Sequence, residues 1–192
     1  LFVGRQRRGL LPYDENIKGS GVPYIPHDRI PTHLPHGVES MNWLDPKGLW
    51  QYKWSLHSAG HASLDLTKDL YREDMFRDRN RESSWLLGDS GGFQIGKGKW
   101  EGDWRANSGC EKAQKKRDGV LRWMDKFMDY GMILDIPVWV DRLPEGAKAS
   151  KISSYQEAVD GTKFNNEYFI KNRNGNCKFL NVLQGENFTQ AD

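Results

Sequence analysis

The stretch Trp85–Gly98 reads WLLGDSGGFQIGKG, and it predicts the fold class of the second half of the chain. Trp85–Leu87 is a short apolar run of the kind found in buried strands, and the glycine-rich turn Gly88–Gly98 follows it directly. A buried strand that ends in glycines is typical of the strand-to-helix connections of parallel α/β proteins. We therefore expect a strand here, with its polar residues at the strand's carboxyl end.

The residues downstream alternate between helical and strand-like patterns. Apolar side chains recur at helical spacing over 110–130, and Gly131 stands where a helix-ending glycine belongs. Further along, the pattern predicts a strand over 132–140, a loop with Pro144 and Gly146, a helix over 154–172 capped by Ser153 or Ser154, and a strand over 178–183. This strand–helix–strand order predicts parallel βαβ units.

Three polar residues recur at successive strand ends. Asp89 and Asp135 are 46 residues apart, and Asp135 and Gln184 are 49 residues apart. This spacing fits an open doubly wound sheet or a (β/α)₈ barrel, and a complete barrel needs about 250 residues. We predict an α/β fold, a partial (β/α)₈ TIM barrel, in a single incomplete catalytic domain, 1–192. Its βα repeats cover 85–192, and 1–84 form an irregular, Pro-rich N-terminal part, because six of the eight prolines lie in 12–48.

The amino-acid composition excludes several classes of protein. A chain with eight Trp, eight Phe and seven Tyr is not disordered, and it has no apolar run long enough to span a membrane. Cys110 and Cys177 are too few for a disulfide framework or a four-cysteine zinc site. With a net charge of only +2, a nucleic-acid partner would need a local basic patch. We expect a cytoplasmic protein and, because the chain starts at Leu1 and stops in a polar stretch, a fragment of a longer one.

The glycine-rich segment nearly matches two motifs of other protein classes. GDSGG, residues 88–92, is the nucleophile sequence of trypsin-like serine proteases, but Phe93 stands where that motif has Pro. Residues 91–97 fit the phosphate loop G-x-x-x-x-G-K, but Gly98 stands where a Ser or Thr should bind magnesium. An unrelated α/β enzyme with a phosphate-binding glycine loop therefore stays open as an alternative.

A third similarity extends over three segments in order. Asp89–Gln94, DSGGFQ, is similar to a segment of the tRNA-guanine transglycosylases. Met132–Asp135, MILD, resembles that family's strand with the base-recognising aspartate, and Val182–Gly185, VLQG, resembles its V-Q-G segment. The resemblance covers about residues 85–190, which correspond to the first half of the family's catalytic barrel.

The resemblance implies an enzyme that exchanges guanine in a polynucleotide for a 7-deazaguanine through a covalent glycosyl-enzyme intermediate. It makes Asp89 the general acid/base, and it places the remaining site residues around the base: Ser90, Gly91, Gly92, Asp135, Gln184 and Gly185. The residue types suit this task without the family. A carboxylate accepts hydrogen bonds from N1–H and the N2 amine of guanine, and a carboxamide donates one to O6. Glycines let a flat base approach the backbone.

The family's nucleophile and its C-x-C-x-x-C…His zinc site lie on later strands, so zinc (Zn²⁺) is expected only in the full-length protein, with no metal ligands in this fragment. The chain alone is then expected to be inactive. Asp135 is followed by Ile136-Pro137 instead of the usual Glu-Cys, and Gln94 by Ile95-Gly96-Lys97. These departures resemble the divergent branch that places 7-deazaguanines in DNA, so the polynucleotide is DNA or tRNA.

Basic and aromatic residues after the glycine-rich segment are candidates for nucleic-acid contact. For the phosphate backbone the candidates are Lys97, Lys99, Lys112, Lys115, Lys116 and Arg117. Trp100 and Trp104 are candidates for stacking on bases. The histidines, His27, His33, His36, His57 and His61, lack the spacing of a metal motif, and we expect surface or core roles for them.

Two other interpretations remain open. Each site residue taken singly is also an ordinary turn or cap residue after a strand. A non-catalytic relative of the family, acting as a nucleic-acid-binding or partner subunit, also fits the sequence, as does a homodimer.

Overall fold

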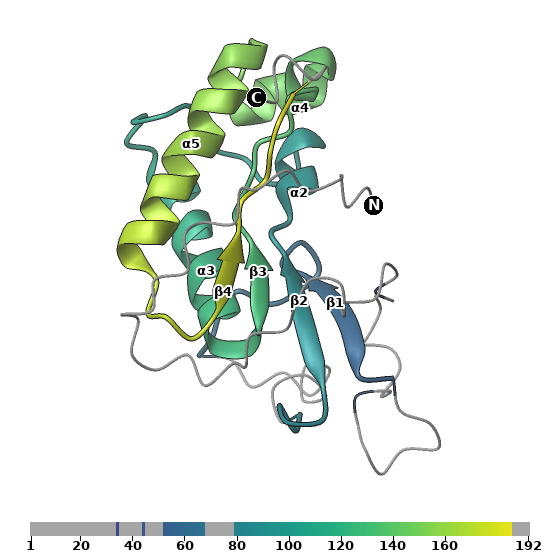
Figure 1. The fold of residues 1–192 in the computed structure, drawn as a ribbon. Coiled ribbons are helices and arrows are strands. Elements are labelled where there is room, and N and C mark those ends of the chain that lie inside the picture. Colours follow the sequence, from purple (N-terminus) through teal and green to yellow (C-terminus); the bar gives the residue numbers. More distant parts are fainter. Residues whose placement is uncertain (1–33, 35–43, 45–51, 68–78, 186–192) are drawn as a thin grey trace.

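The computed structural model describes Leu34, Leu44, residues 52–67 and residues 79–185, so predictions for the other residues lie outside the described part. Four strands form one parallel sheet whose spatial order is the chain order (Figure 1). The strands are β1 (Trp54–Ser58), β2 (Trp85–Asp89), β3 (Tyr130–Met132) and β4 (Lys178–Leu180). The chain is therefore a mixed α/β protein with a parallel sheet, as its alternating pattern predicts.

Helices fill the connections after β2 and β3. The first connection contains α2 (Gly92–Gly96) and α3 (Glu111–Phe127), and the second contains η3 (Val140–Arg142), α4 (Pro144–Ser150) and α5 (Tyr155–Asn172). The long helices α3 and α5 lie side by side along the sheet, whereas α2 and α4 lie beyond the carboxyl ends of the strands (Figure 1). Tyr168 of α5 donates a hydrogen bond to Asp118 of α3 (3.0 Å). Ser154 caps α5 by accepting from the N–H of Glu157 (3.2 Å), as predicted.

The predictions around β3 need two corrections. The helix predicted over 110–130 ends at Phe127, and Gly131 lies inside β3 and not in a helix cap. A Cβ on Gly131 would lie 2.7 Å from Sδ of Met124, so this glycine permits close packing of helix on strand. The strand predicted over 132–140 covers only residues 130–132. Irregular chain follows because Pro137 lacks an N–H and the N–H of Ile136 donates to a side chain, Oγ1 of Thr162.

Other boundaries differ as well. Strand β1 lies in the supposedly irregular part, 1–84, and pairs with β2 along all five residues. The predicted turn Gly88–Gly98 contains the end of β2 and the short helix α2. The predicted loop with Pro144 is helix α4, because proline is favoured in a first helical turn, where its missing N–H has no partner to lose. The last strand ends at Leu180, not at residue 183.

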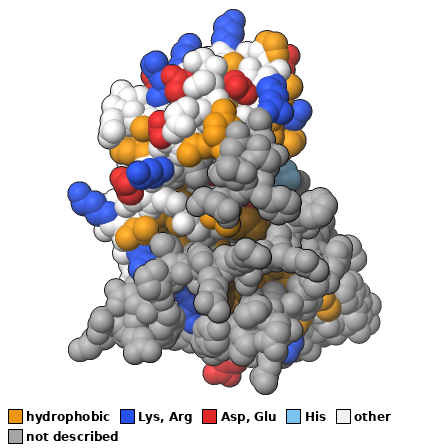
Figure 2. All heavy atoms as spheres, turned by 45° about the horizontal axis from the view of Figure 1, so that its top comes forward, with side chains coloured by type: hydrophobic (Ala, Val, Ile, Leu, Met, Phe, Trp, Pro, Cys, Tyr) orange, Lys and Arg blue, Asp and Glu red, His pale blue; other side chains and the backbone are white. Residues whose placement is uncertain are grey.

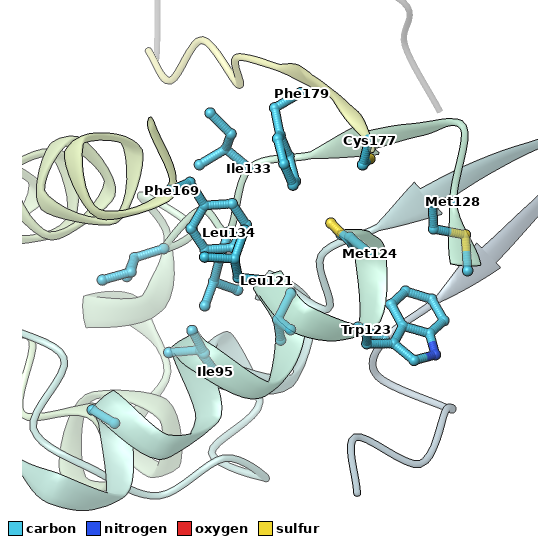
Figure 3. Close-up of a cluster of buried hydrophobic side chains, with 14 of the residues drawn as sticks. Ile95, Leu121, Trp123, Met124, Met128, Ile133, Leu134, Phe169, Cys177 and Phe179 are labelled. Carbon is cyan, nitrogen blue, oxygen red and sulfur yellow. The ribbon is translucent and has the colours of Figure 1, made fainter. Parts of the chain in front are cut away.

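The two faces of the sheet carry different apolar clusters. Leu86 of β2 and Phe179 of β4 point to the side of α3 and α5, where they join the main core. Figure 3 shows side chains from α3, α5 and the neighbouring segments pointing into this common space, and the rings of Phe169 and Phe179 are 5.3 Å apart. The opposite face carries a second cluster, Leu56, Trp85, Leu87 and Tyr130. Strands buried on both faces are typical of parallel sheets.

Candidate functional site

The carboxyl end of β2 presents Asp89 beside the end of β1. Ser58, the last residue of β1, donates a hydrogen bond from Oγ to Oδ2 of Asp89 (2.6 Å). The same Ser58 Oγ accepts from the N–H of Gly60 (3.1 Å), and the N–H of Ala59 donates to the Asp89 carbonyl (2.9 Å). The turn after β1 therefore fixes the position of the Asp89 carboxylate.

Ser90, Asp135 and Gln184 come together although they are far apart in the sequence. Ser90 Oγ donates to Oδ1 of Asp135 (3.2 Å), and Gln184 Nε2 donates to Oδ2 (2.7 Å). Each residue follows a different strand, because Ser90 comes directly after β2, Asp135 after β3 and Gln184 after β4. The sheet thus brings all three to the carboxyl edge, where parallel α/β proteins place their sites.

Asp135 has an unusual electrostatic environment. Burial, together with the negative charge of Asp89, raises the pKa of its carboxyl group, and the hydrogen bonds from Ser90 and Gln184 oppose this rise. Within the described part of the chain both hydrogen-bond donors are neutral, and no cation forms an ion pair with Asp135. A buried carboxylate held only by neutral donors can accept further hydrogen bonds from a ligand that carries N–H groups.

The glycines of the site have packing roles of their own. Gly91 has φ of 78°, and a Cβ there would lie 2.8 Å from the backbone nitrogen of Gly60. A Cβ on Gly92 would overlap the carboxyl and carbonyl groups of Asp135. The two glycines therefore let the chain segments of the site approach one another, a reason other than the access for a flat base that the sequence predicts. Gly185 is exposed next to Gln184.

Most of the lysines proposed as phosphate contacts lie at the surface, and Arg117 does not. Lys97, Lys99, Lys112 and Lys115 are exposed, and Lys115 pairs with Glu111 of its own helix (2.6 Å). On the face seen in Figure 2, Lys and Arg side chains alternate with Asp and Glu side chains around hydrophobic ones.

The prediction that Arg117 contacts the phosphate backbone is wrong, because Arg117 is only 3% exposed and its Nε donates to Oδ1 of Asn165. This arginine joins α3 to α5 and is not presented to a phosphate. Lys116 is half-buried, with Nζ 4.7 Å from the centre of the Trp100 ring, and burial lowers its pKa. Trp104 is fully buried, with Nε1 donating to the Trp100 carbonyl (3.0 Å), so it cannot stack on a base.

The phosphate-loop interpretation conflicts with the backbone of this segment. A phosphate loop needs free N–H groups that point at the ligand. Here the N–H groups of Gln94, Lys97, Gly98 and Lys99 all donate to carbonyls within residues 91–95. These four donors are engaged within α2 and its flanks, so they do not point at a phosphate as the N–H groups of a phosphate loop do.

The described residues do not form a metal site. His57 is buried against the Trp123 ring (5.6 Å between ring centres) and His61 is exposed, whereas His27, His33 and His36 lie outside the described residues. Among residues 52–67 and 79–185, no group of three or more His, Cys, Asp or Glu side chains is arranged to hold a metal ion. The zinc expected by resemblance therefore finds no ligand set in this part of the chain.

Sequence reasoning missed Ser58 as a site residue. Its segment, WSLHS, lies in the part of the chain expected to be irregular. The alternation of Trp54, Leu56 and Ser58 on one side of a strand was the available signal, because it places Ser58 at the strand end next to Asp89.

Comparisons with known proteins identify no protein that is similar to this chain. The chain matches no family model, no curated protein and no solved structure. Among the described residues, no helix is both long enough and apolar enough to cross a membrane.

Proposed function

We propose that this chain carries the guanine-recognition half of a transglycosylase that exchanges guanine in a polynucleotide for a 7-deazaguanine. The observation that supports this most is the convergence of Ser90, Asp135 and Gln184 at one edge of the sheet, with Asp89 beside them. These are the residues that the resemblance to tRNA-guanine transglycosylases assigns to the base. Their contacts supply the donors and acceptors that a guanine edge requires.

The hydrogen-bonding capacity of the cluster fits the Watson–Crick edge of guanine. Asp135 accepts from N1–H and the N2 amine, because each carboxylate oxygen accepts more than one hydrogen bond. Gln184 Nε2 has two hydrogens, so it keeps one bond to Asp135 and donates the other to O6 of the base. Ser90 keeps the orientation of the Asp135 carboxylate. A charged acceptor that is already oriented strengthens recognition of these two donors.

Asp89 transfers protons in the proposed reaction. A carboxylate nucleophile on a later strand attacks C1′ of the sugar, and guanine leaves, taking up a proton. Asp89, held by Ser58 at 2.6 Å, gives this proton and removes one from the incoming 7-deazaguanine. The target nucleotide must leave its stack to reach Asp135. We infer DNA as the polynucleotide, because the residues after Asp135 depart from the pattern of the tRNA enzymes.

The fold that we infer for the complete protein is a (β/α)₈ barrel. The order β1-β2-β3-β4 has no reversal, whereas a doubly wound sheet reverses its strand order at a switch point. Helices α3 and α5 lie along the face of the main core, and the opposite face carries the apolar cluster of Trp85 and Tyr130. In a barrel this second face is the packed interior.

Guanine exchange tests the proposal directly. The complete gene product is incubated with DNA or tRNA containing labelled guanine and with a 7-deazaguanine, and release of label is measured. Asp135→Asn presents a donor to N1–H or N2–H, so we expect base affinity to fall by about 3 kcal/mol, on the order of a hundredfold. Label release should fall with it. Asp160→Asn, an exposed position on α5, is the matched control and should exchange normally.

The outcomes separate the candidate functions. Label release by Asp135→Asn at the unaltered rate would make Asp135 an ordinary turn residue and overturn the proposal. Guanine binding without release, abolished by Asp135→Asn, would identify a non-catalytic binding subunit of the same family.

A further inference from the structure

The chain segment that carries Asp135 turns away from the sheet toward α5. The N–H of Ile133 still donates to the Leu180 carbonyl of β4 (3.0 Å). The carbonyl of Leu134 and the N–H of Ile136 are bonded instead by side chains of α5. Buried backbone groups need such partners, because leaving one unpaired costs about as much as losing a hydrogen bond. Helix α5 thus holds the backbone on both sides of Asp135.

Two buried side chains, three residues apart on α5, make these bonds. Asn165 Nδ2 donates to the Leu134 carbonyl (2.9 Å). Thr162 Oγ1 accepts from the N–H of Ile136 (2.9 Å) and donates to the carbonyl of the same residue (3.4 Å). Because each peptide group is planar, fixing the peptide before Asp135 and the peptide after it fixes both backbone dihedral angles of this residue. The direction in which the Asp135 side chain leaves the backbone is thereby set.

A buried cation holds the Asn165 amide in turn. Arg117 of α3 donates from Nε to Oδ1 of Asn165, and the two side chains belong to residues that are 3% and 0% exposed. A charged donor at Oδ1 strengthens the donation by Nδ2 of the same amide, because hydrogen bonds in a chain polarise one another. The chain of hydrogen bonds therefore runs from the Arg117 guanidinium to the peptide group before Asp135.

The surroundings of Arg117 are costly for a charged group. Among residues 52–67 and 79–185, no carboxylate forms an ion pair with it. Its guanidinium lies 5.6, 4.8 and 5.8 Å from the ring centres of Trp104, Phe164 and Tyr168, and burial lowers its pKa. An apolar side chain would join α3 to α5 without that cost, but it would not hold the Asn165 amide with its NH₂ group toward the backbone.

We propose that Thr162 and Asn165, with Arg117 behind Asn165, are positioning residues for base recognition by Asp135. They hold the carboxylate so that it accepts from N1–H and the N2 amine of guanine at the same time. This inference rests on the proposed function, because it concerns the ligand of Asp135. It assigns the selectivity for guanine over hypoxanthine, which lacks the N2 amine, to side chains that bond the backbone beside Asp135.

Binding of guanine and of hypoxanthine to the complete gene product tests this role. Thr162→Val replaces the hydroxyl by a methyl group and leaves the Ile136 N–H without its acceptor. Asn165→Asp pairs with Arg117, so the fold is retained, but an oxygen replaces the donor to the Leu134 carbonyl. In both variants we expect guanine affinity to fall about tenfold and hypoxanthine affinity to fall less. Thr162→Ser keeps the hydroxyl and should retain the selectivity.

The matched control is Asn172→Asp, which makes the same change at the last residue of α5. Asn172 Nδ2 donates to the Tyr168 carbonyl (2.8 Å), away from Asp135, so both affinities should stay unchanged. Urea denaturation of each variant separates positioning from stability. A loss of stability alone lowers the folded fraction and reduces the apparent affinity for both bases by the same factor, so the ratio of the two affinities does not move.

The outcomes distinguish this inference from the proposed function. An unaltered ratio of guanine to hypoxanthine affinity in Thr162→Val and Asn165→Asp would overturn the inference and leave the proposed function intact. A ratio reduced as much in Thr162→Ser as in Thr162→Val would also overturn it, because the hydroxyl would then have no part in selectivity. Absence of guanine binding in the unaltered protein would remove the proposed function, and this inference with it.

Discussion

Two aspartates flank strand β3, and they have opposite surroundings. Asp129, just before the strand, pairs with Arg79 (2.9 Å), and it accepts a hydrogen bond from the N–H of Leu86 (2.8 Å). Asp135, just beyond the other end, is held by the neutral donors Ser90 and Gln184. Asp129 is buried and Asp135 is partly buried, and within the described residues only Asp129 has a cation beside it.

The difference distinguishes a carboxylate with a structural role, Asp129, from the one for which we propose a functional role, Asp135. A buried charge that is matched by a cation and a backbone N–H ties segments together and has little left for a ligand. A buried charge without a cation is costly, and such groups cluster at functional sites. The comparison also agrees with the general arrangement of parallel α/β folds, in which the carboxyl edge carries the site and the amino edge supports stability.

The largest effect should come from removing the cation at the amino edge. Arg79→Met leaves Asp129 buried without its closest partner and also removes the hydrogen bond from Arg79 Nη2 to the Phe127 carbonyl (2.8 Å). We expect a loss of about 3–5 kcal/mol in the free energy of unfolding, measured by urea denaturation. Arg81→Met is the matched control, because Arg81 is 40% exposed and 3.6 Å from Asp129, and it should cost less than about 1 kcal/mol. Equal losses in both variants would contradict the structural role of the Arg79–Asp129 pair.

The next effect concerns the packing of the site against Asp135. Gly92→Ala forces a methyl group into the space of the Asp135 carboxyl and carbonyl groups, so the aspartate or α2 must move. We expect a destabilisation of about 1–3 kcal/mol and a fall of at least about tenfold in guanine affinity, measured by calorimetric titration. Gly109→Ala is the control, since Gly109 has φ of 67° and open space around it. It should cost about 1 kcal/mol of stability and leave binding unchanged, and normal guanine binding by Gly92→Ala would argue against a base at Asp135.

The sequence predicts the parallel α/β class, two long helices and the positions of the site residues, because these depend on apolar periodicity and on short motifs. The lengths of the strands depend on tertiary partners instead. The apolar pattern predicts a strand that includes residues 133–136. These residues are irregular, because the N–H of Ile136 donates to Oγ1 of Thr162 in α5. Arg117 reads as a surface cation, and only the packing of α3 on α5 reveals that it is buried. Ser58 was not predicted as a site residue, because its short strand precedes a segment without apolar periodicity.

A smaller effect should follow from loosening Asp89 and not Asp135. Ser58→Ala removes the 2.6 Å hydrogen bond to Asp89 and leaves the contacts of Asp135 intact. We expect the exchange rate of the complete gene product to fall by about 1 kcal/mol in activation free energy, roughly fivefold, with unchanged guanine affinity and a shifted pH profile of kcat. Ser58→Thr keeps a hydroxyl and should restore part of the rate. A fall in guanine affinity together with an unchanged pH profile would show that Ser58 serves the fold of the site and not Asp89.

The smallest effect is the sign of the change in stability when each aspartate is replaced by asparagine, and it tests the comparison of Asp135 with Asp129. Burial and the charge of Asp89 raise the pKa of Asp135 in the folded chain above the ordinary value that it has when unfolded. At pH above the raised pKa the carboxylate is charged in both states, and folding bears the full cost of burying it. Below the ordinary value the group is neutral in both states and the cost vanishes, so its contribution to stability improves as pH falls through the window between the two values.

Asp135→Asn is neutral at every pH, so near neutral pH it should be at least as stable as the unaltered chain, and this advantage should shrink as the solution is acidified. Asp129→Asn should be less stable than the unaltered chain near neutral pH, because Arg79 then lacks its anion. Urea denaturation of the three proteins across this pH range makes the measurement. A loss of stability in Asp135→Asn near neutral pH would mean that the hydrogen bonds from Ser90 and Gln184 outweigh the burial of the charge, and the two aspartates would then both be structural.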